Sequence, residues 1–87
     1  MTAELISREQ ISAITTECLA TELKTPLAGI SGADVLKDLP GADSMKLLRV
    51  VSKLERQWDV EFEDEAIFAA KTVDDLVTLV QKCVSED

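Results

Sequence analysis

Apolar residues recur at helical intervals near the start of the chain. Ser7 and Gln10 have the spacing of a capping box, in which the two side chains satisfy free backbone groups at the start of a helix. Behind them, apolar positions return every three or four residues as far as Leu23. The members of this face are Ile11, Ile14, Cys18 and Leu19. The pattern predicts a first helix that ends near Leu23.

A second helix is predicted to begin at Asp43 or Ser44 and to end at about Trp58. Asp43 suits the position before the helix, because its carboxylate can accept from the first free N–H groups and its charge complements the helix dipole. Steps of 100° around the axis place four apolar side chains within about 60° of one another. This predicted core face consists of Leu47, Val51, Leu54 and Trp58.

The last third of the chain predicts one short and one long helix. After the acidic connection Asp59–Glu65, the apolar run Ala66–Ala70 predicts one or two helical turns. Thr72–Asp75 then has the pattern of a helix start, with acidic residues where the dipole favours them. Helical spacing follows at Val73, Leu76, Val77, Val80, Cys83 and Val84. No segment alternates long enough to predict a strand, so the fold class is all-α: a small four-helix bundle with three long helices and one short helix.

The connection between the first two helices is unusually long for so small a chain. All the glycines and prolines lie between residues 26 and 41, which predicts one long loop. Such a loop needs a structural or functional reason. Its apolar residues predict that it packs over the core, and these are Leu27, Ile30, Val35, Leu36 and Leu39.

Composition narrows the possible functions. The 87 residues suit a single domain over residues 1–87, and a hydrophobic content of 46% with 30% charged residues is typical of a globular protein. The net charge of −8 argues against nucleic acid or an anionic membrane as a partner. The acidic start and the short apolar runs predict neither a signal peptide nor a membrane span, and hence a soluble, cytoplasmic protein. Because histidine is absent, the usual general base and the commonest metal ligand are missing, so an enzyme is disfavoured.

The two cysteines and the acidic run after the second helix are further candidate sites. Cys18 and Cys83 lack the spacing of a zinc or redox motif; we expect small buried hydrophobic residues, and a disulfide between the two ends of the chain stays open as an alternative. The run from Asp59 has carboxylates at alternate positions, as in a calcium loop. However, Asp64 stands where that loop needs glycine and Ala70 where it needs glutamate, so we predict no metal site.

Ser44 is the candidate residue with a chemical role. A loop segment that contains glycine leads into the second helix and places Ser44 in its first turn. Free N–H groups and the helix dipole favour a phosphate there. The alternative is that Ser44 only shares the capping of the helix with Asp43. These observations leave both open.

The surrounding pattern resembles the acyl carrier proteins and the related peptidyl carrier domains. Their hallmark Asp-Ser-Leu, or Asp-Ser-Ile or Asp-Ser-Met, reads Asp43-Ser44-Met45 here, and Asp38-Leu39 precedes it as in the family, with Pro40 as an apparent insertion. The downstream matches follow in the family's order. They are Leu54-Glu55, Trp58–Phe62, Asp64-Glu65 and Thr72-Val73.

This resemblance implies a four-helix carrier domain that is not an enzyme. A separate phosphopantetheinyl transferase, with magnesium, would move 4′-phosphopantetheine from coenzyme A onto Ser44, supported by Asp43 as helix cap. Acyl or aminoacyl groups would then be held as thioesters and presented to other enzymes. The implied partners are an acyl-loading or adenylation enzyme and ketosynthase, condensation or tailoring enzymes, and the carrier itself is expected to be a monomer. A helical interaction domain whose Ser44 is never modified is the alternative of a different class.

The charge of the second helix indicates which kind of biosynthetic pathway the carrier would serve. Residues 44–58 hold four basic residues and one acidic residue, whereas fatty-acid carriers are acidic there. We call Lys46, Arg49, Lys53 and Arg56 the basic stripe. Beside it lie Met45, Leu48 and Ser52, which match the family's contact points, so the stripe and these three residues are predicted to bind partner enzymes. The pattern favours a free-standing carrier of polyketide or nonribosomal peptide biosynthesis, with a carrier of primary fatty-acid synthesis as the alternative.

Overall fold

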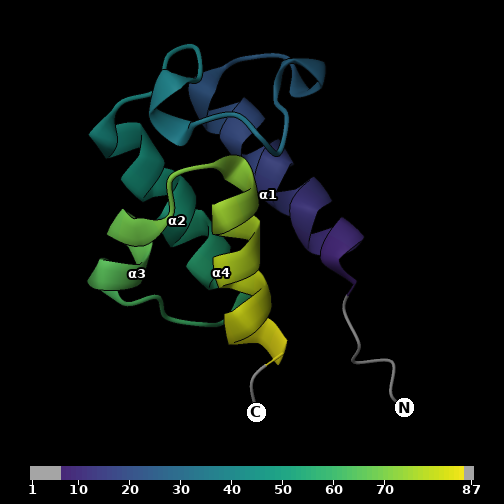
Figure 1. The fold of residues 1–87 in the computed structure, drawn as a ribbon, viewed down its shortest axis with the longest axis vertical. Helices are drawn as coiled ribbons and strands as arrows, with labels where there is room; N and C mark the ends of the chain where they lie inside the picture. Colours follow the sequence, from purple (N-terminus) through teal and green to yellow (C-terminus); the bar gives the residue numbers. More distant parts are fainter. Residues whose placement is uncertain (1–6, 86–87) are drawn as a thin grey trace.

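A computed structural model describes residues 7–85, and these residues form a small helical bundle (Figure 1). The four helices are α1 (Arg8–Leu23), α2 (Ser44–Trp58), α3 (Asp64–Ala69) and α4 (Val73–Ser85). Within the described range there is no strand, and α1 packs against both α2 and α4. The predicted all-α bundle of three long helices and one short helix is therefore confirmed.

Local hydrogen bonds fix the starts of α1 and α4. Ser7 Oγ accepts from the Gln10 N–H at 3.1 Å, and the Ser7 N–H donates to Gln10 Oε1 at 3.1 Å, so the predicted capping box is present. Before α4, Thr72 Oγ1 accepts from the Asp75 N–H at 3.1 Å. Asp75 Oδ2 accepts in turn from the N–H groups of Lys71 (3.0 Å) and Thr72 (3.1 Å). These two bonds favour the ionised carboxylate and lower the pKa of Asp75.

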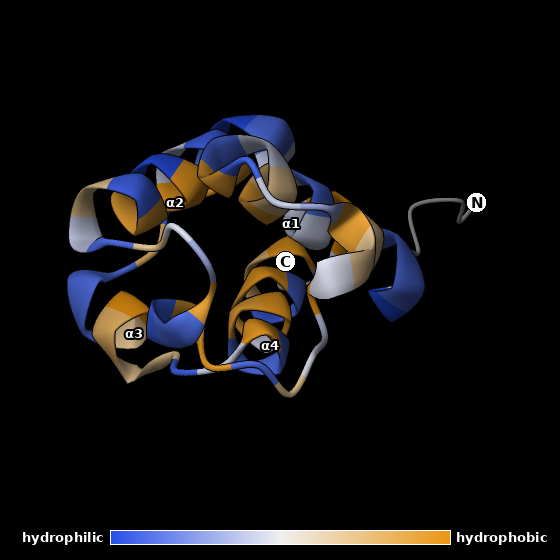
Figure 2. Ribbon diagram, turned by 90° about the horizontal axis from the view of Figure 1, so that it is seen from above, coloured by the Kyte–Doolittle hydropathy of each residue, from blue (hydrophilic) through white to orange (hydrophobic). Residues whose placement is uncertain are grey.

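The core lies where α1, α2 and α4 face one another, and Figure 2 shows their hydrophobic segments turned towards this centre. Its buried helical side chains are Ile11, Leu19, Leu23, Val50, Val51, Leu54, Val73, Leu76, Val77 and Val80. Two details differ from the prediction. Val50 is fully buried, whereas Leu47 and Trp58 are only half-buried, so the core face of α2 is rotated relative to the predicted one. On α1 the buried line also includes Thr15, whose hydroxyl is enclosed in the core.

The connection between α1 and α2 contains two 3-10 turns, Leu27–Gly29 and Leu36–Asp38. Leu36 and Leu39 are buried and Ile30 packs against the core, as predicted. Leu27 and Val35 are exposed at 53% and 40%, so their predicted packing is wrong. The segment lies across one end of the bundle (Figure 1), and only its second half is anchored by fully buried side chains.

Backbone hydrogen bonds tie this connection to the start of α4. The Leu36 N–H donates to the carbonyl of Lys71 at 2.9 Å, beside an isolated antiparallel bridge between Val35 and Thr72. The N–H groups at the start of α4 donate back to the carbonyls of Asp34 (3.0 Å) and Gly32 (2.9 Å). The loop is therefore held by ordinary main-chain pairing as well as by its apolar side chains.

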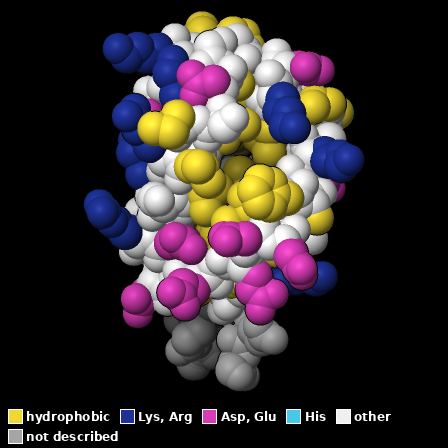
Figure 3. Space-filling view, turned by 90° about the vertical axis from the view of Figure 1, so that its left-hand side faces the viewer, with side chains coloured by type: hydrophobic (Ala, Val, Ile, Leu, Met, Phe, Trp, Pro, Cys, Tyr) yellow, Lys and Arg dark blue, Asp and Glu magenta, His cyan; other side chains and the backbone are white. Residues whose placement is uncertain are grey.

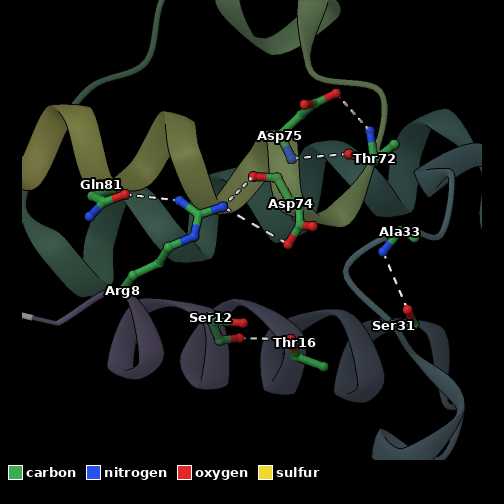
Figure 4. A network of polar contacts seen from close by, with 9 residues as sticks. All are labelled: Arg8, Ser12, Thr16, Ser31, Ala33, Thr72, Asp74, Asp75 and Gln81. Carbon is green, nitrogen blue, oxygen red and sulfur yellow. Dashed lines mark hydrogen bonds and ion pairs between the residues drawn. The ribbon is translucent and has the colours of Figure 1, made fainter.

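A polar contact at the surface joins α1 to α4 (Figure 4). Arg8 Nη1 donates to Gln81 Oε1 at 2.9 Å, and Nη2 donates to the carbonyl of Asp74 at 3.3 Å. The same guanidinium lies 3.9 Å from Asp74 Oδ1. Because Asp74 also pairs through its N–H with Gly32, this cluster links α1, the loop and α4.

The two cysteines belong to the packing of the helices. Cys18 and Cys83 are thiols. The sequence predicts small buried hydrophobic residues at both positions, and both pack against the core but are only half-buried. Burial raises the pKa of Cys18, which keeps it in the unreactive thiol form near neutral pH. Neither α1 nor any other helix in residues 7–85 combines the length and the apolar character that a membrane span requires.

Candidate functional site

The start of α2 is built by a tight turn followed by a side-chain cap. The Ala42 N–H donates to the carbonyl of Leu39 at 3.0 Å, and Gly41 within this turn has φ +78°. Asp43 then takes an extended conformation, and its Oδ1 accepts from the Lys46 N–H at 2.9 Å. The predicted helix cap is therefore present at Asp43.

Gly41 is needed for two reasons. Its positive φ is unfavourable for a residue with a side chain. A Cβ atom at this position would also lie 3.1 Å from the carbonyl oxygen of Leu23, closer than ordinary van der Waals contact. The turn thus brings the end of α1 against the segment that leads into α2, and this close approach fixes where α2 begins.

Ser44 is the first residue of α2, and its side chain is exposed. Within the described residues its hydroxyl has no hydrogen-bond partner, since the capping is done by Asp43. A serine acting as a nucleophile needs an adjacent base, and the chain contains no histidine. The geometry places this hydroxyl at the surface in the first helical turn, where free N–H groups favour a phosphate.

Exposed apolar side chains are present on both α2 and α3. Met45 is 65% exposed and Leu48 is 49% exposed, and Ser52 is exposed on the same side of α2. Phe68 of α3 is 78% exposed. Figure 3, which views the side of the molecule formed by α2 and α3, shows hydrophobic side chains gathered around a hollow, with acidic side chains below them. The predicted contact residues of α2 are therefore exposed, on one of the two helices that form this apolar side of the molecule.

One residue of α1 forms ion pairs with two of the four residues of the basic stripe. Glu22 Oε1 lies 3.0 Å from Lys53 Nζ, and Glu22 Oε2 lies 3.4 Å from Arg49 Nη1. These contacts, above all the one with Lys53, lower the pKa of Glu22. Lys46 is half-buried and Arg56 is exposed, and neither forms an ion pair within residues 7–85. Two of the four predicted basic contacts are thus already paired within the protein.

Two residues of this region were missed by sequence reasoning. Phe68 was counted only as part of the apolar run after the acidic connection; its exposure depends on how α3 sits, which the run alone does not specify. Glu22 lies far from α2 in the sequence, and its polar position on α1 carries no local signal of a partner. A helical wheel predicts which residues of one helix share a face. It does not predict which residues of another helix contact that face.

Comparison with known proteins agrees with this geometry. The family model described as "Phosphopantetheine attachment site" matches residues 14–80, a segment that contains α2. An acyl carrier protein of an Exiguobacterium species is 32% identical over 76 residues, which cover 87% of this chain and 96% of that protein. The chain belongs to the acyl carrier protein family. Two further family members are similar: an acyl carrier protein of Exiguobacterium sibiricum (30% identical, covering 87% of this chain and 96% of that protein) and acyl carrier protein 3 of Ralstonia nicotianae (31% identical, covering 77% of each chain).

Membership of the acyl carrier protein family implies a covalently attached 4′-phosphopantetheine. The residues at the start of α2 fit such a group. Ser44 presents an exposed hydroxyl that has no hydrogen-bond partner among residues 7–85, and the capped end of the helix lies beside it. The group would supply a terminal thiol on a long flexible arm.

Proposed function

We propose that this chain is a carrier in which Ser44 bears the prosthetic group and Asp43 supports it by capping α2. The observation that carries the proposal is the exposed hydroxyl of Ser44 at the first residue of α2, within the segment that matches the family. The cap keeps this residue at a fixed place in the first turn. The helix dipole then favours the negative charge of a phosphodiester there.

The chain acts as the acceptor in the loading step. Ser44 Oγ forms a bond to phosphorus while the phosphoanhydride bond of coenzyme A breaks, and adenosine 3′,5′-bisphosphate leaves. The proton of the hydroxyl is proposed to pass to a base of the phosphopantetheinyl transferase, since the chain has no histidine and Asp43 Oδ1 already accepts from the Lys46 N–H. The protein contributes position and charge, and the transferase contributes the catalysis.

After loading, the carrier acts by raising the local concentration of a tethered intermediate at successive enzymes, without catalysis of its own. We propose Met45, Leu48 and Ser52, together with the basic stripe, as the surface that these enzymes contact. The exposure of Met45 and Leu48 beside Ser44 supports this. The carrier is proposed to work as a cytoplasmic monomer.

The proposed pathway is polyketide or nonribosomal peptide biosynthesis. The basic stripe on α2 supports it, since Lys46 and Arg56, which form no ion pair within residues 7–85, would be repelled by the basic docking surfaces expected of fatty-acid enzymes. Loading enzymes, ketosynthases or condensation enzymes with apolar or acidic docking surfaces are then the proposed partners. Primary fatty-acid synthesis is the alternative, and it would be favoured if a fatty-acid malonyl transferase loaded the carrier efficiently.

Mass spectrometry of the intact protein tests the attachment site. Incubation with coenzyme A, magnesium and a purified phosphopantetheinyl transferase should raise the mass by one phosphopantetheine. Ser44→Ala should abolish the rise. Thr78→Ala is the matched control, because Thr78 is an exposed hydroxyl residue of α4, outside the proposed contact surface, and its loss should leave loading intact. An unchanged mass of the wild-type chain would support an unmodified interaction domain, and modification of Ser44→Ala would place the group elsewhere.

A further inference from the structure

Glu22 contacts the two central residues of the basic stripe at once. It lies in the last turn of α1, and each of its carboxylate oxygens pairs with a different cation of α2: Lys53 at 3.0 Å and Arg49 at 3.4 Å. The Glu22 side chain is 13% exposed, whereas those of Arg49 and Lys53 are 63% and 46% exposed. The Glu22 side chain is therefore largely covered, whereas its two cationic partners remain at the surface.

The stability of α1 does not explain an acidic residue at this place. The carbonyl end of a helix carries partial negative charge, so a carboxylate in the last turn is unfavourable for α1 itself. Its favourable contacts are made with α2. Arg49 and Lys53 are one helical turn apart and would repel each other, and a carboxylate between them relieves this repulsion. Glu22 thus acts on the charge of α2.

We propose that Glu22 is a specificity-determining residue that sets how much positive charge α2 presents to partner enzymes. By pairing with Arg49 and Lys53 it lowers the field over the centre of the stripe, and Lys46 and Arg56 are left as the cations without an ion pair in residues 7–85. The inference rests on the proposed function, in which α2 contacts these enzymes. Loss of Glu22 would make the surface more attractive to acidic partners and less attractive to basic ones.

Loading kinetics with two transferases test this inference. The probes are two purified phosphopantetheinyl transferases, one with an acidic and one with a basic carrier-docking surface, each assayed with coenzyme A and magnesium. At low salt, Glu22→Gln should lower KM about two- to five-fold for the acidic enzyme and raise it by a similar factor for the basic one. Both effects should fade at about 0.5 M salt, where exposed charges are screened within a few ångströms.

Two further variants separate charge from structure. Glu17→Gln removes the same charge from an exposed position of α1 that forms no ion pair in residues 7–85, and it should change KM less than Glu22→Gln does. In a background of Arg49→Gln and Lys53→Gln, where Glu22 has lost both of these cations, the Glu22 substitution should change KM no more than Glu17→Gln does. Circular dichroism of each variant checks that the helices are retained.

The outcomes are distinct. Opposite shifts of KM for the two enzymes would support the role of Glu22. Shifts in the same direction for both enzymes would indicate a structural role only, and equal effects of Glu22→Gln and Glu17→Gln would indicate net charge alone; either result overturns the inference. If neither transferase loads the wild-type chain, the proposed function fails instead.

Discussion

Two leucines of α2 allow the placement of the core to be tested by the same substitution. Leu54 is fully buried, whereas Leu48, about 120° away around the same helix, is 49% exposed. Leu54→Ala and Leu48→Ala remove the same atoms and change helix propensity equally. Any difference between the two variants therefore reports burial.

The expected magnitudes differ several-fold. Truncation of a fully buried leucine costs about 2 to 5 kcal/mol, because the lost transfer free energy adds to that of the cavity left behind. Exposed positions away from special features usually change stability by less than about 0.5 kcal/mol. A domain of this size is expected to have a free energy of unfolding of about 4 to 13 kcal/mol. Leu54→Ala should thus remove a large share of the total, with a fall in Tm on the order of 10 to 30 °C.

Urea unfolding followed by far-ultraviolet circular dichroism and by the fluorescence of Trp58 measures both variants. The midpoint should fall strongly for Leu54→Ala and barely for Leu48→Ala, with similar m-values. Leu48→Ala should at the same time weaken transfer by partner enzymes if it belongs to the contact surface. Equal midpoints for the two variants would refute the assignment of the core face of α2.

Three further predictions concern the loop and the start of α4. Gly41→Ala should destabilise the domain by about 1 to 2 kcal/mol in urea unfolding, because φ is +78° at this position. Gly29→Ala should cost less, because the nearest atom lies 4.0 Å from the new Cβ. Equal losses of stability in the two variants would contradict the role of Gly41 in the turn. In hydrogen exchange, the Leu36 amide, which is bonded to the segment before α4, should exchange more slowly than that of the exposed Ala28, and equally fast exchange would show that the loop is not held. The lowered pKa of Asp75 stabilises the fold above the pKa of the unfolded chain, about 4, and this contribution is lost as the pH falls through the lower folded value. Asp75→Asn should therefore be less stable than the wild type at pH 7, with a gap that narrows below about pH 4; a gap independent of pH would contradict this assignment.

The sequence was most informative where structure is determined by neighbouring residues. The capping box at Ser7 and the cap at Asp43 each depend on contacts within a few positions, so their residue types predict both helix starts. The periodic apolar residues likewise predict the helices of the bundle. Ser44 could be singled out because its position after Asp43 sets it in the first helical turn.

Features that depend on how the helices meet could not be predicted in the same way. Val50 is buried and Trp58 only half-buried because the rotation of α2 is set by packing against α1 and α4, which the apolar positions of α2 define only approximately. The exposure of Leu27 shows that an apolar loop residue need not reach the core. The pairing of Glu22 with the basic stripe required the relative placement of two helices, which no local pattern contains.

The main-chain contacts between the loop and the start of α4 join segments that leave the ribosome at different times. Leu36 emerges well before Lys71, the residue whose carbonyl its N–H needs, and the bridge between Val35 and Thr72 has the same order. Until α4 has been synthesised, the loop before Ser44 lacks these hydrogen-bond partners, and the core lacks the buried side chains of α4. We therefore expect the proposed attachment site to reach its folded form only after α4 has been synthesised, so that a transferase meets its folded target only on a chain that already contains α4.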